Sequence, residues 1–152
     1  MADLNFCTAV DLIIKASMEG KPRHEVVLHV GKTPELLISY GLPDLPLVIT
    51  GRTIDKIFFD HGITKGVIER LHGLVSSPMT IYRAAPPHQS GSVVVTLETH
   101  RGCPVIIPIR ASKQFGRSYF ANEITSMYAK EGESFDKRWL SAGLLLWAKN
   151  NP

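Results

Sequence analysis

The chain has 152 residues, a net charge of +3 and a pI of about 9.0, with 44% apolar and 20% charged residues. This length suits one domain, and the composition is that of a globular protein rather than a disordered one. No apolar run approaches the roughly 20 residues of a membrane-spanning helix, and no basic start precedes an apolar stretch at the N-terminus. The two cysteines lack a C-x-x-C spacing, so we expect a soluble cytoplasmic protein in a reducing compartment.

Helical patterns dominate the first part of the chain. Apolar residues at helical spacing predict an amphipathic helix over Leu4–Met18. The apolar, β-branched stretch Glu25–Val30 predicts a short strand. Thr33 suits the N-cap and Pro34 the first position of a helix that stops at Gly41.

Two more helices are expected before the middle of the chain. One is capped by Thr50 or Thr53 and runs to about His61, and Thr64 caps the next, which ends at Ser76-Ser77-Pro78. Between the second and third helices, Leu47–Ile49 is apolar but short.

After Pro78 the apolar period changes from that of a helix to that of a strand. Pro, Gly, Ser and His separate four extended segments, Met79–Arg83, Ser92–Glu98, Pro104–Arg110 and Phe120–Lys130. Short links favour an antiparallel meander. A last helix, Phe135–Ala148, has Ser134 as its expected cap. These patterns predict an α+β fold, with N-terminal helices packed on a small antiparallel sheet and a C-terminal helix.

His61 is the most informative single position for chemistry. Exposed carbonyls at a helix end favour a protonated imidazole, and a histidine that titrates near neutrality suits general acid or base work. The alternative is a helix-ending histidine that serves only the helix dipole.

The segment Phe120–Lys130 offers a second candidate site. Strict alternation places on one face Asn122, Ile124, Ser126, Tyr128 and Lys130. That face could present an amide, a hydroxyl, a phenol and an ammonium group to a phosphate. A solvent-exposed sheet face is the alternative interpretation.

Other motifs are incomplete. Gly31-Lys32-Thr33 resembles the end of a phosphate-binding loop, but Val26 stands in place of the upstream glycine. Lys32 still precedes a predicted helix N-terminus, which favours an anion. The histidine spacings match no zinc motif, and G-x-S-x-G is missing. We therefore expect no metal and no cofactor.

An ordered set of segments carries a family resemblance: Val30–Pro34, Tyr40–Leu42, Leu45–Ile49, Asp55–Ile57, His61–Ile63, Asn122–Tyr128 and Gly143–Lys149. In these segments the chain resembles the nuclease-like domain at the C-terminus of phage Mu F-type minor head proteins. That domain is grouped with the barnase, EndoU, colicin and RelE ribonuclease toxins. The resemblance implies a barnase/RelE-like domain over residues 23–152, preceded by an N-terminal helix extension over residues 1–22.

The resemblance also implies metal-independent cleavage of RNA in a toxin or phage–host conflict setting. The hypothesis is attack by the ribose 2′-hydroxyl, with a catalytic set of His61, Lys56, Ser126 and Tyr128. The substrate-binding set is Lys32, Asn122 and Lys130. The expected partners are an RNA substrate and a cognate immunity protein or antitoxin, with no membrane. The alternative is a non-catalytic binding or inhibitor protein, encoded by a phage or mobile element, on the same fold.

Overall fold

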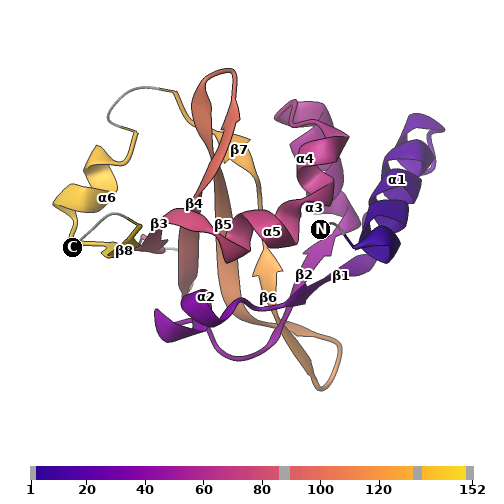
Figure 1. The fold of residues 1–152 in the computed structure, drawn as a ribbon. Coiled ribbons are helices and arrows are strands. Elements are labelled where there is room, and N and C mark those ends of the chain that lie inside the picture. The colour runs from indigo at the N-terminus through magenta and orange to yellow at the C-terminus, as the bar shows by residue number, and fades with distance from the viewer. Residues whose placement is uncertain (1–2, 86–89, 132–134, 150–152) are drawn as a thin grey trace.

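The computed structural model describes residues 3–85, 90–131 and 135–149. In this part of the chain, one eight-stranded sheet has the order β1-β2-β6-β5-β4-β3-β8, and the short β7 pairs with β5. Figure 1 shows helices over one face of this sheet and α6 at its far end. The α+β class is confirmed, whereas the sheet is larger than predicted and is mixed rather than antiparallel.

The strands are β1 (Val27–Lys32), β2 (Pro46–Thr50), β3 (Pro78–Arg83), β4 (Gly91–His100), β5 (Cys103–Phe115), β6 (Tyr119–Ile124), β7 (Tyr128–Ala129) and β8 (Leu145–Ala148). The helices are α1 (Leu4–Met18), α2 (Glu35–Ser39), α3 (Gly51–Asp55), α4 (Lys65–Glu69), α5 (Leu71–Ser76) and α6 (Lys137–Ser141). A π-helical turn, η1 (Lys56–Asp60), continues α3. No helix in the described ranges is both long enough and apolar enough to cross a bilayer.

Helix α1 has the predicted bounds. Asp3 caps it, because its carboxylate accepts hydrogen bonds from the first backbone N–H groups of the helix. Its buried side chains, Phe6, Val10, Ile13 and Ile14, join the main hydrophobic core. Burial of each such side chain contributes about 1.5–3 kcal/mol, so α1 is part of the core of the domain.

The caps Thr50 and Thr64 are confirmed, since each hydroxyl accepts from the backbone N–H three residues later. The predicted cap at Thr33 is wrong. Pro34 takes the cap position of α2 without a side-chain bond, and the Thr33 hydroxyl donates instead to the carbonyl of Leu45. A threonine hydroxyl satisfied elsewhere leaves the helix end uncapped.

The predicted meander is also wrong. β2 runs parallel to β6, with Leu47, Val48 and Ile49 opposite Asn122, Glu123 and Ile124. The three β2 residues are at most 1% exposed, as is usual for a strand buried on both faces. Partners so distant in sequence leave no local signal of their pairing.

The C-terminal helix is shorter than predicted. α6 ends at Ser141, and Gly143 takes a left-handed conformation (φ 71°). The apolar residues that follow form β8 and pair antiparallel with β3. An open sheet edge therefore outweighs the helical preference of Leu and Ala here. The predicted cap Ser134 lies outside the described residues.

The predicted strand Phe120–Lys130 is interrupted at residues 125–127. On either side of the break, Ile124 pairs with Ile109 and Tyr128 pairs with Ile106. Ile106 and Ile109 point to opposite faces of β5 because they are an odd number of residues apart. The predicted shared face of Asn122, Ser126 and Tyr128 is therefore wrong: Ile124 belongs to the main core and Tyr128 packs on a second cluster.

The two faces of the sheet differ in their cover. The main core lies under α1 to α5, whereas α6 covers a smaller cluster on the other face, which includes Tyr82, Val95 and Ile106. On that second face, polar side chains of β1, β5 and β6 lie beside the buried apolar residues Val48 and Ala121.

Candidate functional site

His61 ends η1, as predicted, and its ring is fixed by one contact. Nδ1 lies 2.8 Å from the carbonyl oxygen of Met127. Because a carbonyl only accepts, Nδ1 carries the proton in this contact, and a neutral ring then has Nε2 as its basic nitrogen. The fold thus sets the tautomer that a general base requires.

One other predicted residue, Tyr128, lies close to this histidine. The Tyr128 ring is 6.1 Å from the His61 ring, centroid to centroid, in an edge arrangement. Burial raises the pKa of the Tyr128 hydroxyl, so the phenol is a neutral donor at physiological pH. Ser126 is half-buried in the link between β6 and β7. The structure therefore brings His61 and Tyr128 together, and Ser126 directly precedes the residue whose carbonyl the His61 ring contacts.

The two predicted lysines of this region differ in their contacts. Lys56 is exposed, and its link to His61 is through the main chain, where the His61 N–H donates to the Lys56 carbonyl at 3.0 Å. The Lys130 ammonium lies 5.2 Å from the centre of the Trp139 ring, which is a cation–π contact with α6.

Asn122 is completely buried. Its Nδ2 donates to the Thr33 hydroxyl and to the Pro43 carbonyl, each at 2.9 Å. Its Oδ1 accepts from the Ser112 N–H at 3.2 Å. The amide thus uses both donors and one acceptor inside the protein, where it ties β6 to the segment after β1 and to β5.

Lys32 lies at the end of the edge strand β1, opposite Pro46. Its carbonyl accepts from His72 Nε2 at 2.8 Å. The ring of His72 packs on Gly31, where a Cβ would come within 2.8 Å of it. Beside this contact is a cleft of about 460 Å³ that Lys32, Arg70 and His72 help to line.

Strand pairing shows a second polar group that sequence reasoning missed. Glu123 on β6 lies opposite Arg110 on β5 and opposite Val48 on β2. Val48 in turn lies opposite His29 on β1. Residues directly opposite one another share a sheet face, so His29, Glu123 and Arg110 form one row across four strands, on the face that helices α1 to α5 leave free.

More cations adjoin this row. Lys113 pairs with Ala121, two residues before Glu123 and therefore on the same face. Lys32, opposite Pro46, lies near the end of the row, and its ammonium is 4.0 Å from the Glu35 carboxylate. His29 is exposed, and Glu123, Arg110 and Lys113 are half-buried, so solvent and a ligand can reach the row.

Burial raises the pKa of the Glu123 carboxyl above its ordinary value, and the charges of Lys113 and Arg110 oppose that rise. A carboxylate whose pKa is raised toward neutrality is a stronger base than an ordinary surface glutamate. The same two cations would stabilise negative charge on a bound phosphate.

The sequence carries only a weak signal of this row. Alternation in Phe120–Lys130 does place Glu123 and Asn122 on opposite faces of the strand, but it does not indicate which of the two faces packs on the core. The neighbours of Glu123 come from β2 and β5, and only the pairing of these strands places His29 and Arg110 beside it.

A family model described as the phage MuF C-terminal domain matches residues 55–151. The matched region includes His61, Arg110, Lys113 and Glu123, whereas His29 and Lys32 precede it. Neither the curated proteins nor the solved structures contain a significant match to the chain.

Proposed function

The chain belongs to the phage MuF C-terminal domain family, and we propose that it is a metal-independent endoribonuclease whose reaction occurs on the polar sheet face. The observation that supports this most is the position of Glu123. This half-buried carboxyl has a raised pKa, lies near two cations and is in register with His29 across Val48. A base, an acid and a phosphate-binding pair are the groups that RNA cleavage by a neighbouring hydroxyl requires.

In the proposed reaction, the Glu123 carboxylate accepts the proton of the ribose 2′-hydroxyl while its oxygen attacks the adjacent phosphorus. Arg110 and Lys113 stabilise the charge that develops on the phosphate oxygens. Protonated His29 donates to the departing 5′-oxygen. The products are a 2′,3′-cyclic phosphate and a 5′-hydroxyl end.

The spacing of the row suits these roles. Adjacent strands lie about 4.8 Å apart, so the backbones at His29 and Glu123, two strands apart, are separated by about 10 Å. Side chains that extend from such positions can approach one phosphodiester from opposite sides. Val48 lies between them and is 1% exposed, so it separates the two side chains and is itself covered.

His61 lies farther along the same sheet. Its neighbour Tyr128 pairs with Ile106, four residues from Arg110 on β5, or about 13 Å along the strand. We therefore propose that His61, Tyr128 and Ser126 contact the next nucleotide of the RNA. The sequence instead predicts that His61 is itself the acid or base. Single substitutions distinguish this catalytic role from a role in RNA contact.

The test is cleavage of a defined RNA in EDTA by wild type, Glu123→Gln, His29→Ala and His61→Ala, with Glu19→Gln as an exposed control. General acid–base groups contribute about 10²–10⁴-fold, so Glu123→Gln and His29→Ala should each lose at least about 100-fold in kcat. His61→Ala should mainly raise KM. A loss of kcat in His61→Ala with full activity in Glu123→Gln would show that His61, and not Glu123, acts as the acid or base.

Expression in a bacterium provides a cellular test. Wild type should arrest growth, Glu123→Gln should not, and a small protein encoded beside the gene should relieve the arrest if it is the cognate inhibitor. Growth arrest by both forms would point to the alternative function, a protein that binds its target without cutting it.

A further inference from the structure

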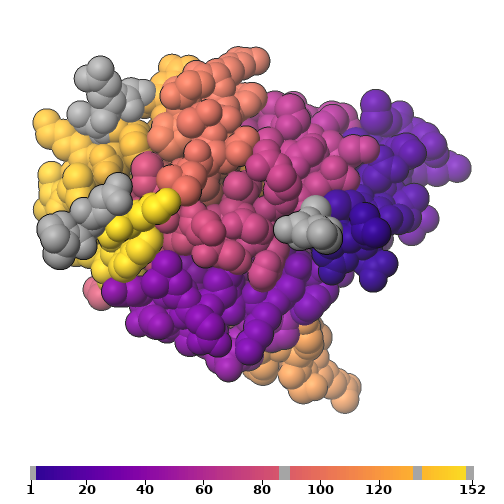
Figure 2. All heavy atoms as spheres, in the orientation of Figure 1, coloured from indigo at the N-terminus to yellow at the C-terminus, as the bar shows by residue number. Residues whose placement is uncertain are grey.

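The hairpin that joins β5 to β6 extends beyond the rest of the sheet. The pairing of β4 with β5 reaches Arg110, and that of β2 with β6 begins at Asn122. Among the described strands, the tip of the hairpin (residues 113–121) is therefore paired only within itself. Figure 1 shows it below β6, and in Figure 2 it stands clear of the body of the molecule.

A β-bulge sets the direction of this tip. Ser112 has a positive φ of 53°, and the register of β5 with β6 shifts between Arg110 and Lys113. The N–H of Ser112 donates to the buried side chain of Asn122. A bulge of this kind bends and twists a hairpin, and a buried amide that is also bonded to Thr33 and Pro43 holds the bend in place.

The tip presents exposed aromatic rings. Tyr119 is 43% and Phe120 is 44% exposed. The rings of Phe115 and Tyr119 pair across the hairpin with centroids 6.4 Å apart. Exposed aromatic side chains gathered on a protruding element usually mark a binding surface.

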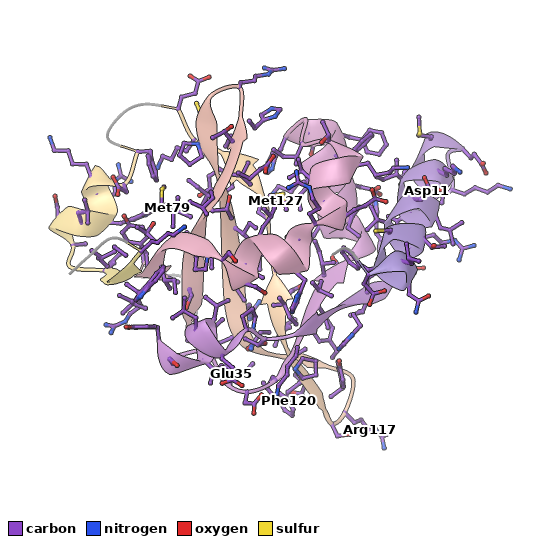
Figure 3. The ribbon with its side chains drawn as sticks, viewed as in Figure 1. Asp11, Glu35, Met79, Arg117, Phe120 and Met127 are labelled. Carbon is purple, nitrogen blue, oxygen red and sulfur yellow. The ribbon has the colours of Figure 1, made fainter. Side chains whose placement is uncertain are left out.

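The charged residues of the tip itself, Lys113 and Arg117, are both positive. From Arg101 to Asn122 the sequence contains no Asp or Glu. Lys113 lies within the tip, and Arg117 occupies its turn. In Figure 3 the Arg117 side chain points away from the protein, with Phe120 nearer the body. Aromatic rings between cations are what a single-stranded nucleic acid requires, since bases stack and phosphates pair with the cations.

The tip is also continuous with the proposed catalytic row. Tyr119, Ala121 and Glu123 alternate onto one face of β6, and Phe115 and Lys113 share that face by pairing. Tyr119 is four residues from Glu123, which is about 13 Å along the strand. A strand of RNA with one phosphate at Glu123 can therefore place a base farther along on Tyr119.

We propose that residues 113–121 bind single-stranded RNA on one side of the cleaved phosphate, with a base stacked on Tyr119 and phosphates held by Lys113 and Arg117. This inference rests on the proposed function and adds a substrate class: unpaired RNA longer than a dinucleotide. Duplex RNA is disfavoured because its bases are stacked on each other and do not expose their faces to the rings.

The binding test uses a fluorescent 12-nucleotide 2′-O-methyl RNA, which cannot undergo 2′-hydroxyl attack, as a single strand and as a duplex. Wild type should bind the single strand more tightly. Tyr119→Ala should weaken that binding about tenfold, in line with one lost stacking contact. Arg117→Ala should lower the slope of log K against log salt by about 0.7, as expected for one lost phosphate contact on a single strand.

Matched controls are Tyr40→Ala, which removes an exposed tyrosine at the C-cap of α2, and Arg138→Ala, which removes an exposed arginine on α6. Both should bind as wild type does. A kinetic test uses the ratio of kcat/KM for a 12-nucleotide RNA to kcat/KM for a dinucleotide. This ratio should fall about tenfold in Tyr119→Ala, again by the loss of one stacking contact.

The inference and the proposed function fail in different ways. Hairpin-dependent binding of the 2′-O-methyl strand, without cleavage of any RNA, would support the inference and overturn catalysis. Cleavage by wild type with unchanged binding in Tyr119→Ala and Arg117→Ala would overturn the inference. Equal affinity for single strand and duplex would overturn it as well.

Discussion

His61 Nδ1 and the carbonyl oxygen of Met127 lie 2.8 Å apart, and this contact joins the end of η1 to the break between β6 and β7. Met127 itself is completely buried in the main core. The histidine therefore bonds to a carbonyl at the point where the strand is interrupted. Its ring has a structural role whatever its part in chemistry.

Loss of this ring should lower stability. His61→Ala removes one hydrogen bond to a partly buried carbonyl, so the free energy of unfolding should fall by about 1 kcal/mol. Urea denaturation measures it. His100→Ala, at the end of β4, is the control and should change stability by less than about 0.5 kcal/mol. Equal values for the two variants would mean that the contact contributes nothing.

Asn122→Ala should be among the most destabilising polar substitutions. It leaves the Thr33 hydroxyl, the Pro43 carbonyl and the Ser112 N–H without the partner that they share. The Thr33 hydroxyl keeps its bond to the Leu45 carbonyl and Ser112 is exposed, so we expect a loss of about 1–3 kcal/mol in the free energy of unfolding, measured by chemical denaturation. The exposed Asn5→Ala is the matched control, and a loss as small as that of the control would refute this role.

Two glycines should respond in opposite directions to alanine. A Cβ at Gly51 would lie 2.0 Å from the Arg23 carbonyl oxygen, which is backbone and cannot move away cheaply. Gly51→Ala should therefore cost about 2 kcal/mol or more. Gly66 in α4 has open space around it, so Gly66→Ala should stabilise by about 0.5–1 kcal/mol. Thermal melts compare the pair, and similar melting temperatures would contradict the close contact at Gly51.

Glu123 should make stability fall as pH rises. Burial raises its pKa in the folded state, so between the ordinary glutamate value and the raised one the folded protein binds more protons than the unfolded one. Under that condition the free energy of unfolding decreases with pH. Glu123→Gln should therefore gain stability relative to wild type near pH 7 and lose this gain below about pH 4. Melting temperatures across this range test it, and a difference that does not change with pH would contradict the raised pKa.

The parts of the fold that could be predicted from sequence are those set by nearby residues. Helix α1 and the caps at Thr50 and Thr64 follow from spacing and side-chain chemistry within one turn. The predicted C-terminal helix was wrong over Leu145–Ala148. The composition of this segment favours a helix, but the segment pairs with the edge of β3, which is distant in sequence. Whether such a segment forms a strand or a helix depends on pairing with strands that are distant in the sequence.

In the candidate site, too, the residues set by local features could be predicted and those set by distant strand pairing could not. His61 could be found because a helix end is a local feature, and Ser126 and Tyr128 were candidates from the alternation in Phe120–Lys130, which the family resemblance also covers. The row of His29, Glu123 and Arg110 could not be found, because it depends on β2 inserting parallel to β6. The interruption at residues 125–127 also changes the alternation, so a strict period of two assigned Asn122 and Tyr128 to one face.

The chemistry of the RNA ends tests the central claim most directly. A 12-nucleotide RNA is incubated with the protein in EDTA, and its products are analysed by mass spectrometry, beside the Glu123→Gln variant and an RNA with 2′-deoxyribose at the cleaved position. Wild type should give 2′,3′-cyclic phosphate and 5′-hydroxyl ends, and the RNA should stay intact in the other two reactions. Intact RNA with wild type, or the same products from Glu123→Gln at an equal rate, would contradict the central claim.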